Sequence, residues 1–117
     1  MNRCLTALAL VLVAMQVGCG ITGTWRFQEI WPETASRQFR MHEVTLRKDG
    51  SATIHYEHRA EPLETIYEFG GTQLVFKARE FRDGLRADAK LTDLDLGMVL
   101  TFESMEGMVE VTFRRVE

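Results

Sequence analysis

Beyond the first 22 residues, apolar and polar positions alternate along almost the whole chain with a period of two. β-Branched and aromatic residues are frequent in these stretches, and short breaks, several of them containing glycine, separate them. A period of two sends successive side chains to opposite faces of a strand, so the pattern predicts an all-β protein. The eight predicted strands are residues 23–30, 38–47, 51–58, 63–69, 72–79, 85–91, 96–103 and 108–116.

Three tight connections predict the register of their hairpins, because a slip of one residue would turn every side chain to the wrong face. We expect a three-residue loop at 48–50 with Gly50 in the left-handed conformation, a two-residue turn at 70–71 and a four-residue loop at 104–107. The inward pairs that follow are Val44–Ile54, Leu46–Ala52, Tyr67–Leu74, Thr65–Phe76, Phe102–Val109, Leu100–Val111 and Met98–Phe113.

Eight short strands joined mostly by tight turns form a meander, and a meander loses its exposed edges by closing into an up-and-down antiparallel barrel. Closure predicts that the last strand lies beside the first, with Trp25, Phe27 and Phe113 inward. Arg115 then lies over the ring of Trp25, a cation–π contact worth about 0.5 to 2 kcal/mol. The alternative for Arg115 is a solvated charge near the chain terminus.

Residues 1–18 differ from the rest of the chain. One charge, Arg3, precedes the apolar run 5–14, which is typical of a secretory signal peptide and shorter than the roughly 20 residues that span a bilayer. The Gly18-Cys19 pair that follows resembles the lipobox of bacterial lipoproteins, whose cysteine is lipidated and becomes the mature N-terminus. The resemblance implies lipidation of Cys19 and a membrane anchor in the bacterial cell envelope. Ordinary cleavage nearby, giving a secreted or periplasmic protein, is the alternative.

The composition, 45% hydrophobic and 26% charged over 117 residues, fits one globular domain, which we place at residues 19–117. Without residues 1–18 the chain has 13 basic and 17 acidic residues, a net charge of −4. This charge disfavours a nucleic-acid partner. Cys4 is removed with the signal peptide, so Cys19 has no disulfide partner and the domain relies on its core.

Several motifs resemble those of lipocalins and of the smaller bacterial lipocalin-like domains. Gly23-Thr24-Trp25 is similar to their Gly-x-Trp opening, the Asp49-Gly50 turn to their common hairpin, and Tyr67 followed by Gly70-Gly71 and Leu74 continues the likeness. The similarity covers most of residues 22–116. It implies a barrel with the tryptophan near the closed end, a long first connection at the mouth, and the binding of a small amphipathic molecule.

Strand direction separates the two ends of the barrel. The turns at 49–50, 70–71 and 92–95 fall at the Trp25 end, which we call the base, and residues 31–37, 59–62, 80–84 and 104–107 form the opposite end, the rim. Near the rim the predicted register turns four polar residues inward, with Arg40 opposite His58 and His42 opposite Tyr56, and Trp31 lies close by in the first connection. These five residues form a candidate site for an anionic or polar-headed amphiphile. A solvated barrel end gives the same pattern.

Candidates for catalysis are scarce. None of the serines falls beside a histidine with an orienting acid, and His55 and His58, three residues apart on a strand, face opposite ways and cannot chelate one metal. We therefore expect no enzymatic activity, no metal and no cofactor. Two functions remain, a carrier of a small amphipathic molecule and an envelope protein-interaction or inhibitor module that uses the rim loops. A filled interior with Trp31 and Met105 exposed would favour the module.

Overall fold

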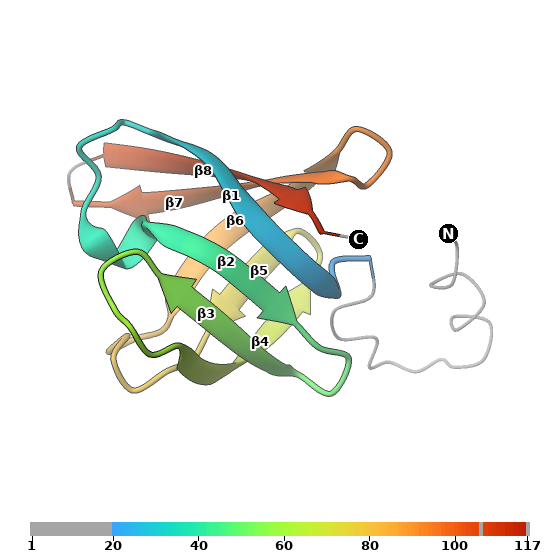
Figure 1. The fold of residues 1–117 in the computed structure, drawn as a ribbon, viewed down its shortest axis with the longest axis horizontal. Coiled ribbons are helices and arrows are strands. Elements are labelled where there is room, and N and C mark those ends of the chain that lie inside the picture. Colours follow the sequence, from blue (N-terminus) through green and yellow to red (C-terminus); the bar gives the residue numbers. More distant parts are fainter. Residues whose placement is uncertain (1–19, 106, 117) are drawn as a thin grey trace.

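Eight antiparallel strands follow one another around a closed barrel in the computed structural model, which describes residues 20–105 and 107–116 (Figure 1). A short 3-10 turn, η1 (Arg37–Phe39), lies between the first two strands. The strands are β1 (Gly23–Trp31), β2 (Met41–Leu46), β3 (Ser51–Tyr56), β4 (Leu63–Gly70), β5 (Gln73–Phe76), β6 (Leu85–Thr92), β7 (Gly97–Ser104) and β8 (Gly107–Arg115). The predicted eight-stranded up-and-down barrel is confirmed. The predicted signal peptide and Cys19 lie outside the described residues. Within the described part, no helix has the length and apolarity to cross a bilayer.

Two of the three predicted hairpin registers are confirmed. Val44 pairs with Ile54 around the turn of β2 and β3, where Gly50 has a φ of 91°. The carboxylate of Asp49 accepts hydrogen bonds from the Ser51 amide at 2.9 Å and hydroxyl at 2.7 Å, which hold the pKa of Asp49 below its usual value. The pairs between β7 and β8 are also those predicted, Phe102–Val109, Leu100–Val111 and Met98–Phe113.

The register predicted for β4 and β5 is wrong by two residues. Tyr67 pairs with Phe76 and Phe69 with Leu74, so β4 extends through Gly70. Gly71 then opens the turn with a φ of 62°, the left-handed conformation that glycine adopts without strain. A shift of two residues keeps every side chain on its face. Tyr67, Leu74 and Phe76 therefore still point inward, as predicted.

β1 and β8 close the barrel at its base. Trp25 pairs with Arg115, whose guanidinium carbon lies 4.2 Å from the centroid of the Trp25 ring, so the predicted cation–π contact is confirmed. Arg115 also donates hydrogen bonds to the carbonyls of Gly20 at 3.0 Å and Thr22 at 2.6 Å. The indole Nε1 of Trp25 donates to the carbonyl of Ile21 at 2.9 Å. These contacts fix residues 20–22 against the base.

Side chains from every strand fill the interior. The largest fully buried ones are Trp25, Phe76, Phe102, Phe113, Ile21, Met41, Leu46, Ile54, Leu74, Met98, Leu100 and Val44. The first connection adds Phe39, which is buried and packs on Phe102 with 5.0 Å between ring centroids. Because Phe102 lies toward the rim, η1 covers that end of the core. The interior is thus a packed hydrophobic core.

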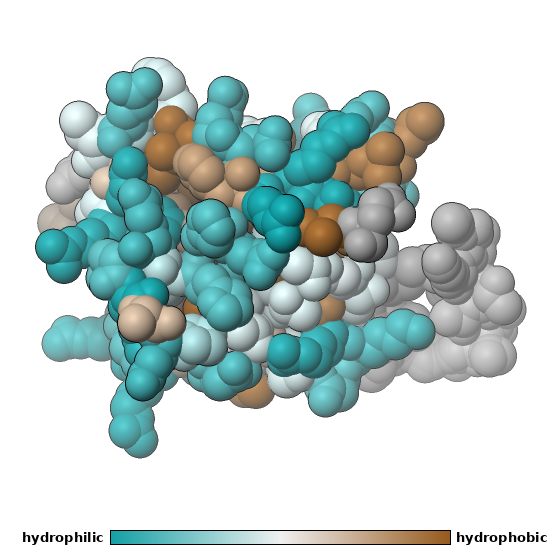
Figure 2. Space-filling view, in the orientation of Figure 1, coloured by the Kyte–Doolittle hydropathy of each residue, from teal (hydrophilic) through white to brown (hydrophobic). Residues whose placement is uncertain are grey.

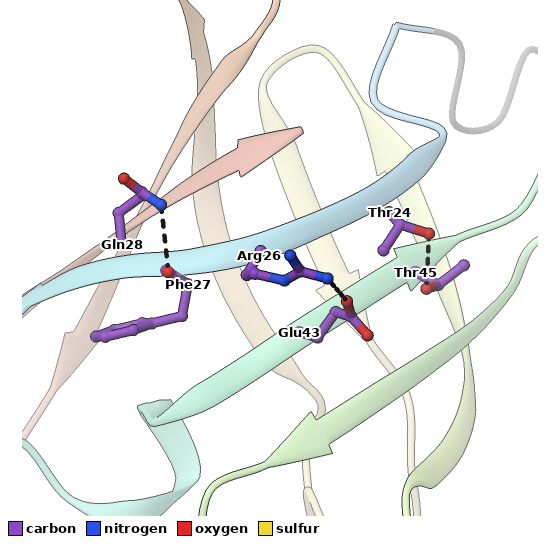
Figure 3. Close-up of polar contacts among 6 residues, drawn as sticks. All are labelled: Thr24, Arg26, Phe27, Gln28, Glu43 and Thr45. Carbon is purple, nitrogen blue, oxygen red and sulfur yellow. Dashed lines mark hydrogen bonds and ion pairs between the residues drawn. The ribbon is translucent and has the colours of Figure 1, made fainter. Parts of the chain in front are cut away.

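Two strands contain β-bulges near the rim, and each bulge reverses the faces of the residues between it and the rim. Figure 3 shows β1 as far as Gln28 beside β2, with outward Arg26 in contact with Glu43 at 3.2 Å. The register of β1 against β8 then shifts at Gln28, so that Ile30 is buried and Trp31 points outward. In β2 the register against β3 shifts at His42.

Three predicted strands are also too long. Residues 38–40 belong to η1 and its end rather than to β2, β3 ends at Tyr56 rather than at residue 58, and β5 ends at Phe76 rather than at residue 79. Residues 77–84 connect β5 to β6 at the rim.

Candidate functional site

Four connections gather at the rim, at the opposite end of the barrel from Gly20 and Arg115 (Figure 1). They join β1 to β2, β3 to β4, β5 to β6 and β7 to β8, as strand direction predicts. Two shallow depressions open there. The first, of about 280 Å³, is lined by Arg37, Arg40, Glu57 and His58. The second, of about 240 Å³, is lined by Arg37, Gln38, Tyr56, His58, Arg59, Leu63, Glu80 and Phe81.

Arg40 lines the first depression, but the prediction that it lies inward on a strand opposite His58 is wrong. Arg40 follows η1, and its Nη1 donates to the carbonyl of Glu33 at 3.0 Å. Its Nε lies 3.4 Å from a carboxylate oxygen of Glu57, and its carbonyl accepts the Glu57 amide at 3.3 Å. Arg40 therefore links the first connection to the end of β3, and its charge is already paired.

The prediction that His42 lies inward opposite Tyr56 is also wrong. Met41 takes that place, fully buried and paired with Tyr56, while Glu43 pairs with His55. His42 is the extra residue of the bulge and is exposed. Neither depression includes His42 in its lining.

Tyr56 and His58 do lie together, with 5.3 Å between their ring centroids. Tyr56 is buried, and its hydroxyl donates to the carbonyl of Gln38 at 2.9 Å. Burial raises the pKa of Tyr56 well above its usual value of 10, so the phenol remains protonated. His58 is exposed. This side of the rim therefore presents apolar side chains, Leu63 and Phe81, next to basic and acidic ones.

The lining residues that the sequence did not indicate are Arg37, Gln38, Glu57, Arg59, Leu63, Glu80 and Phe81. Most of them belong to η1 and the rim connections, where no period marks a side chain's direction. Arg37 and Arg59 have no ion pair among the described residues, in contrast to Arg40.

Trp31 lies on the outer face of the barrel and not at the mouth as expected. It ends β1 opposite Glu110 of β8, with 67% of its surface exposed. Neither depression is lined by Trp31. Of the five predicted ligand-binding residues, the structure brings together Arg40, Tyr56 and His58 and leaves His42 and Trp31 apart from them.

A second surface lies around Trp31. Met105, in the turn between β7 and β8, is fully exposed, and Met108 on β8 is half-exposed. Three carboxylates accompany these apolar side chains on the outer face. We call Trp31, Met105, Met108, Glu29, Glu103 and Glu110 together the Trp31 patch. In Figure 2 the visible face is mostly hydrophilic, with apolar side chains at the upper left, over the rim half of β1 and β8, and at the upper right, over the turn between β6 and β7.

Comparisons of the chain with protein-family models, with curated proteins and with solved structures gave no match. The lipobox and lipocalin-like resemblances therefore stay predictions. Among the described residues, no three histidine, cysteine or acidic side chains are grouped so that they could hold a metal ion.

Proposed function

We propose that this protein is a lipid-anchored module of the bacterial cell envelope that binds a protein partner through its rim and the adjoining Trp31 patch, without catalysis. The packed interior is the observation that supports this proposal. A barrel that carries a small molecule keeps a cavity for it. Here Trp25, Phe76 and Phe113 occupy the interior and Phe39 covers the rim end, while Trp31 and Met105 are exposed.

A small anionic amphiphile is the second candidate ligand, favoured by one feature of the second depression. Leu63 and Phe81 form part of its wall, beside the guanidinium groups of Arg37 and Arg59. Glu80 lines the same depression and would repel an anion. Since the depression is shallow and open, such a ligand would bury little of its apolar part, so this candidate ranks below a protein partner.

Two features support the anchoring part of the proposal. Gly18-Cys19 resembles a lipobox, and the chain is fixed against the base from residue 20 onward by Arg115 and Trp25. A lipid on Cys19 would therefore hold the base close to the membrane and leave the rim facing away from it. A rim in that position is accessible to other envelope proteins.

Replacing Cys19 with serine should move the protein from the membrane fraction to the soluble fraction of cells that express the full chain. The thiol is the proposed attachment point of the lipid, and serine keeps the size of the side chain without the sulfur. Fractionation with immunodetection measures the change, and the intact mass of the purified protein should include acyl chains. An unmodified mass together with a soluble unmutated protein would disprove the anchor.

A photo-cross-linking amino acid placed at Met105 should give one discrete cross-linked product in opened envelopes prepared from cells that express the full chain. Excess purified protein should suppress that product, whereas excess Trp31→Ala protein should suppress it at least tenfold less well. Leu94 provides the matched control, because it is exposed in the turn between β6 and β7 at the base. A cross-linker at Leu94 should not give the same product.

Titration with a panel of fatty acids separates the two candidate functions. For a protein-binding module we expect no saturable change in Trp fluorescence, with Trp31→Phe identifying the signal of Trp25. Saturable binding of one fatty acid per chain, without a competed cross-link at Met105, would overturn the proposal in favour of a carrier.

A further inference from the structure

The sheet register assembles the Trp31 patch from three strands. Glu110 of β8 lies directly opposite Trp31 of β1, and Glu103 of β7 lies directly opposite Met108. Side chains on directly opposite residues of antiparallel strands are neighbours on one face. Glu29 precedes Trp31 by two residues and shares its face. An exposed indole and a half-exposed methionine are thus flanked by three carboxylates.

These three carboxylates have no ion-pair partner among the described residues. The ion pairs there join Arg26 to Glu43, Arg40 to Glu57, Lys77 to Glu68 and Arg114 to Asp93. The cations on the outer face of β1 and β8, Arg26 and Arg114, lie nearer the base and are each paired with a different acid. Among the described residues, no basic side chain therefore lies within ion-pair distance of the three carboxylates that surround the exposed Trp31 ring.

The chemistry of the patch suits one kind of partner. The face of an indole ring attracts cations, and arginine also stacks on aromatic rings while its fork of N–H donors pairs with a carboxylate. Exposed tryptophan is among the residues that contribute most to binding when a partner covers it. Methionine side chains adapt to an irregular apolar surface, a role open to Met105 and Met108.

We propose that the Trp31 patch binds a basic segment of the partner protein, with an arginine over the Trp31 ring and paired with Glu110, and a second basic residue paired with Glu103. This inference rests on the proposed function, since it names the chemistry of the partner. The acidic residues give the patch selectivity for cationic over acidic or neutral segments, because like charges across an interface oppose binding.

The test is the binding of a labelled basic peptide. A fluorescein-labelled peptide of alternating arginine and alanine is titrated with the protein purified as Cys19→Ser, and fluorescence anisotropy measures the affinity. We expect saturable binding that weakens as the salt concentration rises. A peptide with lysine in place of arginine should bind several-fold more weakly, and one with glutamate should not bind.

Variants with matched charge changes distinguish binding to the Trp31 patch from an effect of the protein's net charge. Trp31→Ala and the double variant Glu103→Gln/Glu110→Gln should each weaken binding of the arginine peptide by about tenfold or more. The control is the double variant Glu68→Gln/Asp95→Asn, which changes the charge equally at exposed positions on β4 and in the turn between β6 and β7, away from the rim. It should change the affinity less than twofold. Circular dichroism and thermal unfolding verify that each variant is folded.

Three outcomes would overturn the inference. These are no binding of the arginine peptide, equal weakening by both double variants, or unchanged binding by Trp31→Ala. If the cross-link at Met105 still forms and is still competed in any of these cases, the proposed function stands and only the basic character of the partner is wrong. If the cross-link is absent as well, both proposals fail.

Discussion

Replacing Trp25 with alanine should lower the free energy of unfolding by about 3 to 5 kcal/mol, the range for deleting a large buried aromatic side chain. Trp25 is fully buried, and it holds the base together through its hydrogen bond to Ile21 and the guanidinium of Arg115 stacked on its ring. Removal of the indole would leave a cavity where β1 meets β8. Urea titration followed by circular dichroism measures the loss as a lower midpoint.

Glu43→Ala is the control on the neighbouring strand. Glu43 faces outward and pairs with Arg26, whose side chain is largely exposed, so its loss should change the free energy of unfolding by about 0.5 kcal/mol or less. Similar losses in the two variants would show that the inward and outward faces of β1 and β2 are wrongly assigned. A large loss only in Trp25→Ala supports the closure of the barrel between β1 and β8.

Strands, closure and most registers could be predicted because they depend on one simple period. Around Gly50, only the three-residue loop places Val44 and Ile54 on the same face, so the alternation and the turn chemistry agree. The predicted register around Gly71 is wrong by two residues, and because this number is even each side chain stays on its predicted face. Where the apolar alternation and the turn residues favour the same pairing, the sequence is sufficient to predict the register of a hairpin.

The candidate site was less predictable because bulges interrupt β1 and β2 near the rim. An inserted residue reverses the faces of everything beyond it, and a strict period of two cannot represent it. The chain does contain a signal. Phe27 and Ile30 are three residues apart, as are Met41 and Val44, and in each case both residues point inward with a bulge between them. An apolar spacing of three within an alternating run would have placed Trp31 and His42 on the outer face.

The remaining errors at the rim come from tertiary structure. The alternating pattern extends the predicted strand over residues 38–40, yet Arg37–Phe39 form η1, in which Phe39 is buried against Phe102. This contact joins segments more than 60 residues apart, which local propensity does not report. The same turn positions Arg40 beside Glu33 and Glu57, so the pairing of its charge also depends on the tertiary fold.

Met41→Ala should lower the free energy of unfolding by about 2 to 5 kcal/mol, the range for truncating a buried methionine, whereas His42→Ala should change it by about 0.5 kcal/mol or less. Met41 is fully buried and pairs with Tyr56, while His42 is the exposed extra residue of the bulge. The two positions are adjacent, so both variants alter the same strand at the same level along the barrel. Comparison of the two urea titrations therefore shows how the free energy of unfolding depends on whether the altered side chain points inward or outward.

A regular β2 without the bulge predicts the reverse order of effects, because His42 would then be inward and Met41 outward. A larger loss in His42→Ala than in Met41→Ala would thus restore the polar mouth that alternation alone predicts, together with its case for an amphiphile bound inside the barrel. The order expected from the structure places an apolar Met41 inward beside Tyr56. In that case no histidine points inward at this position at the rim end of the core. A partner would then bind to an outer surface, and the Trp31 patch has both the carboxylates and the exposed aromatic ring to bind it.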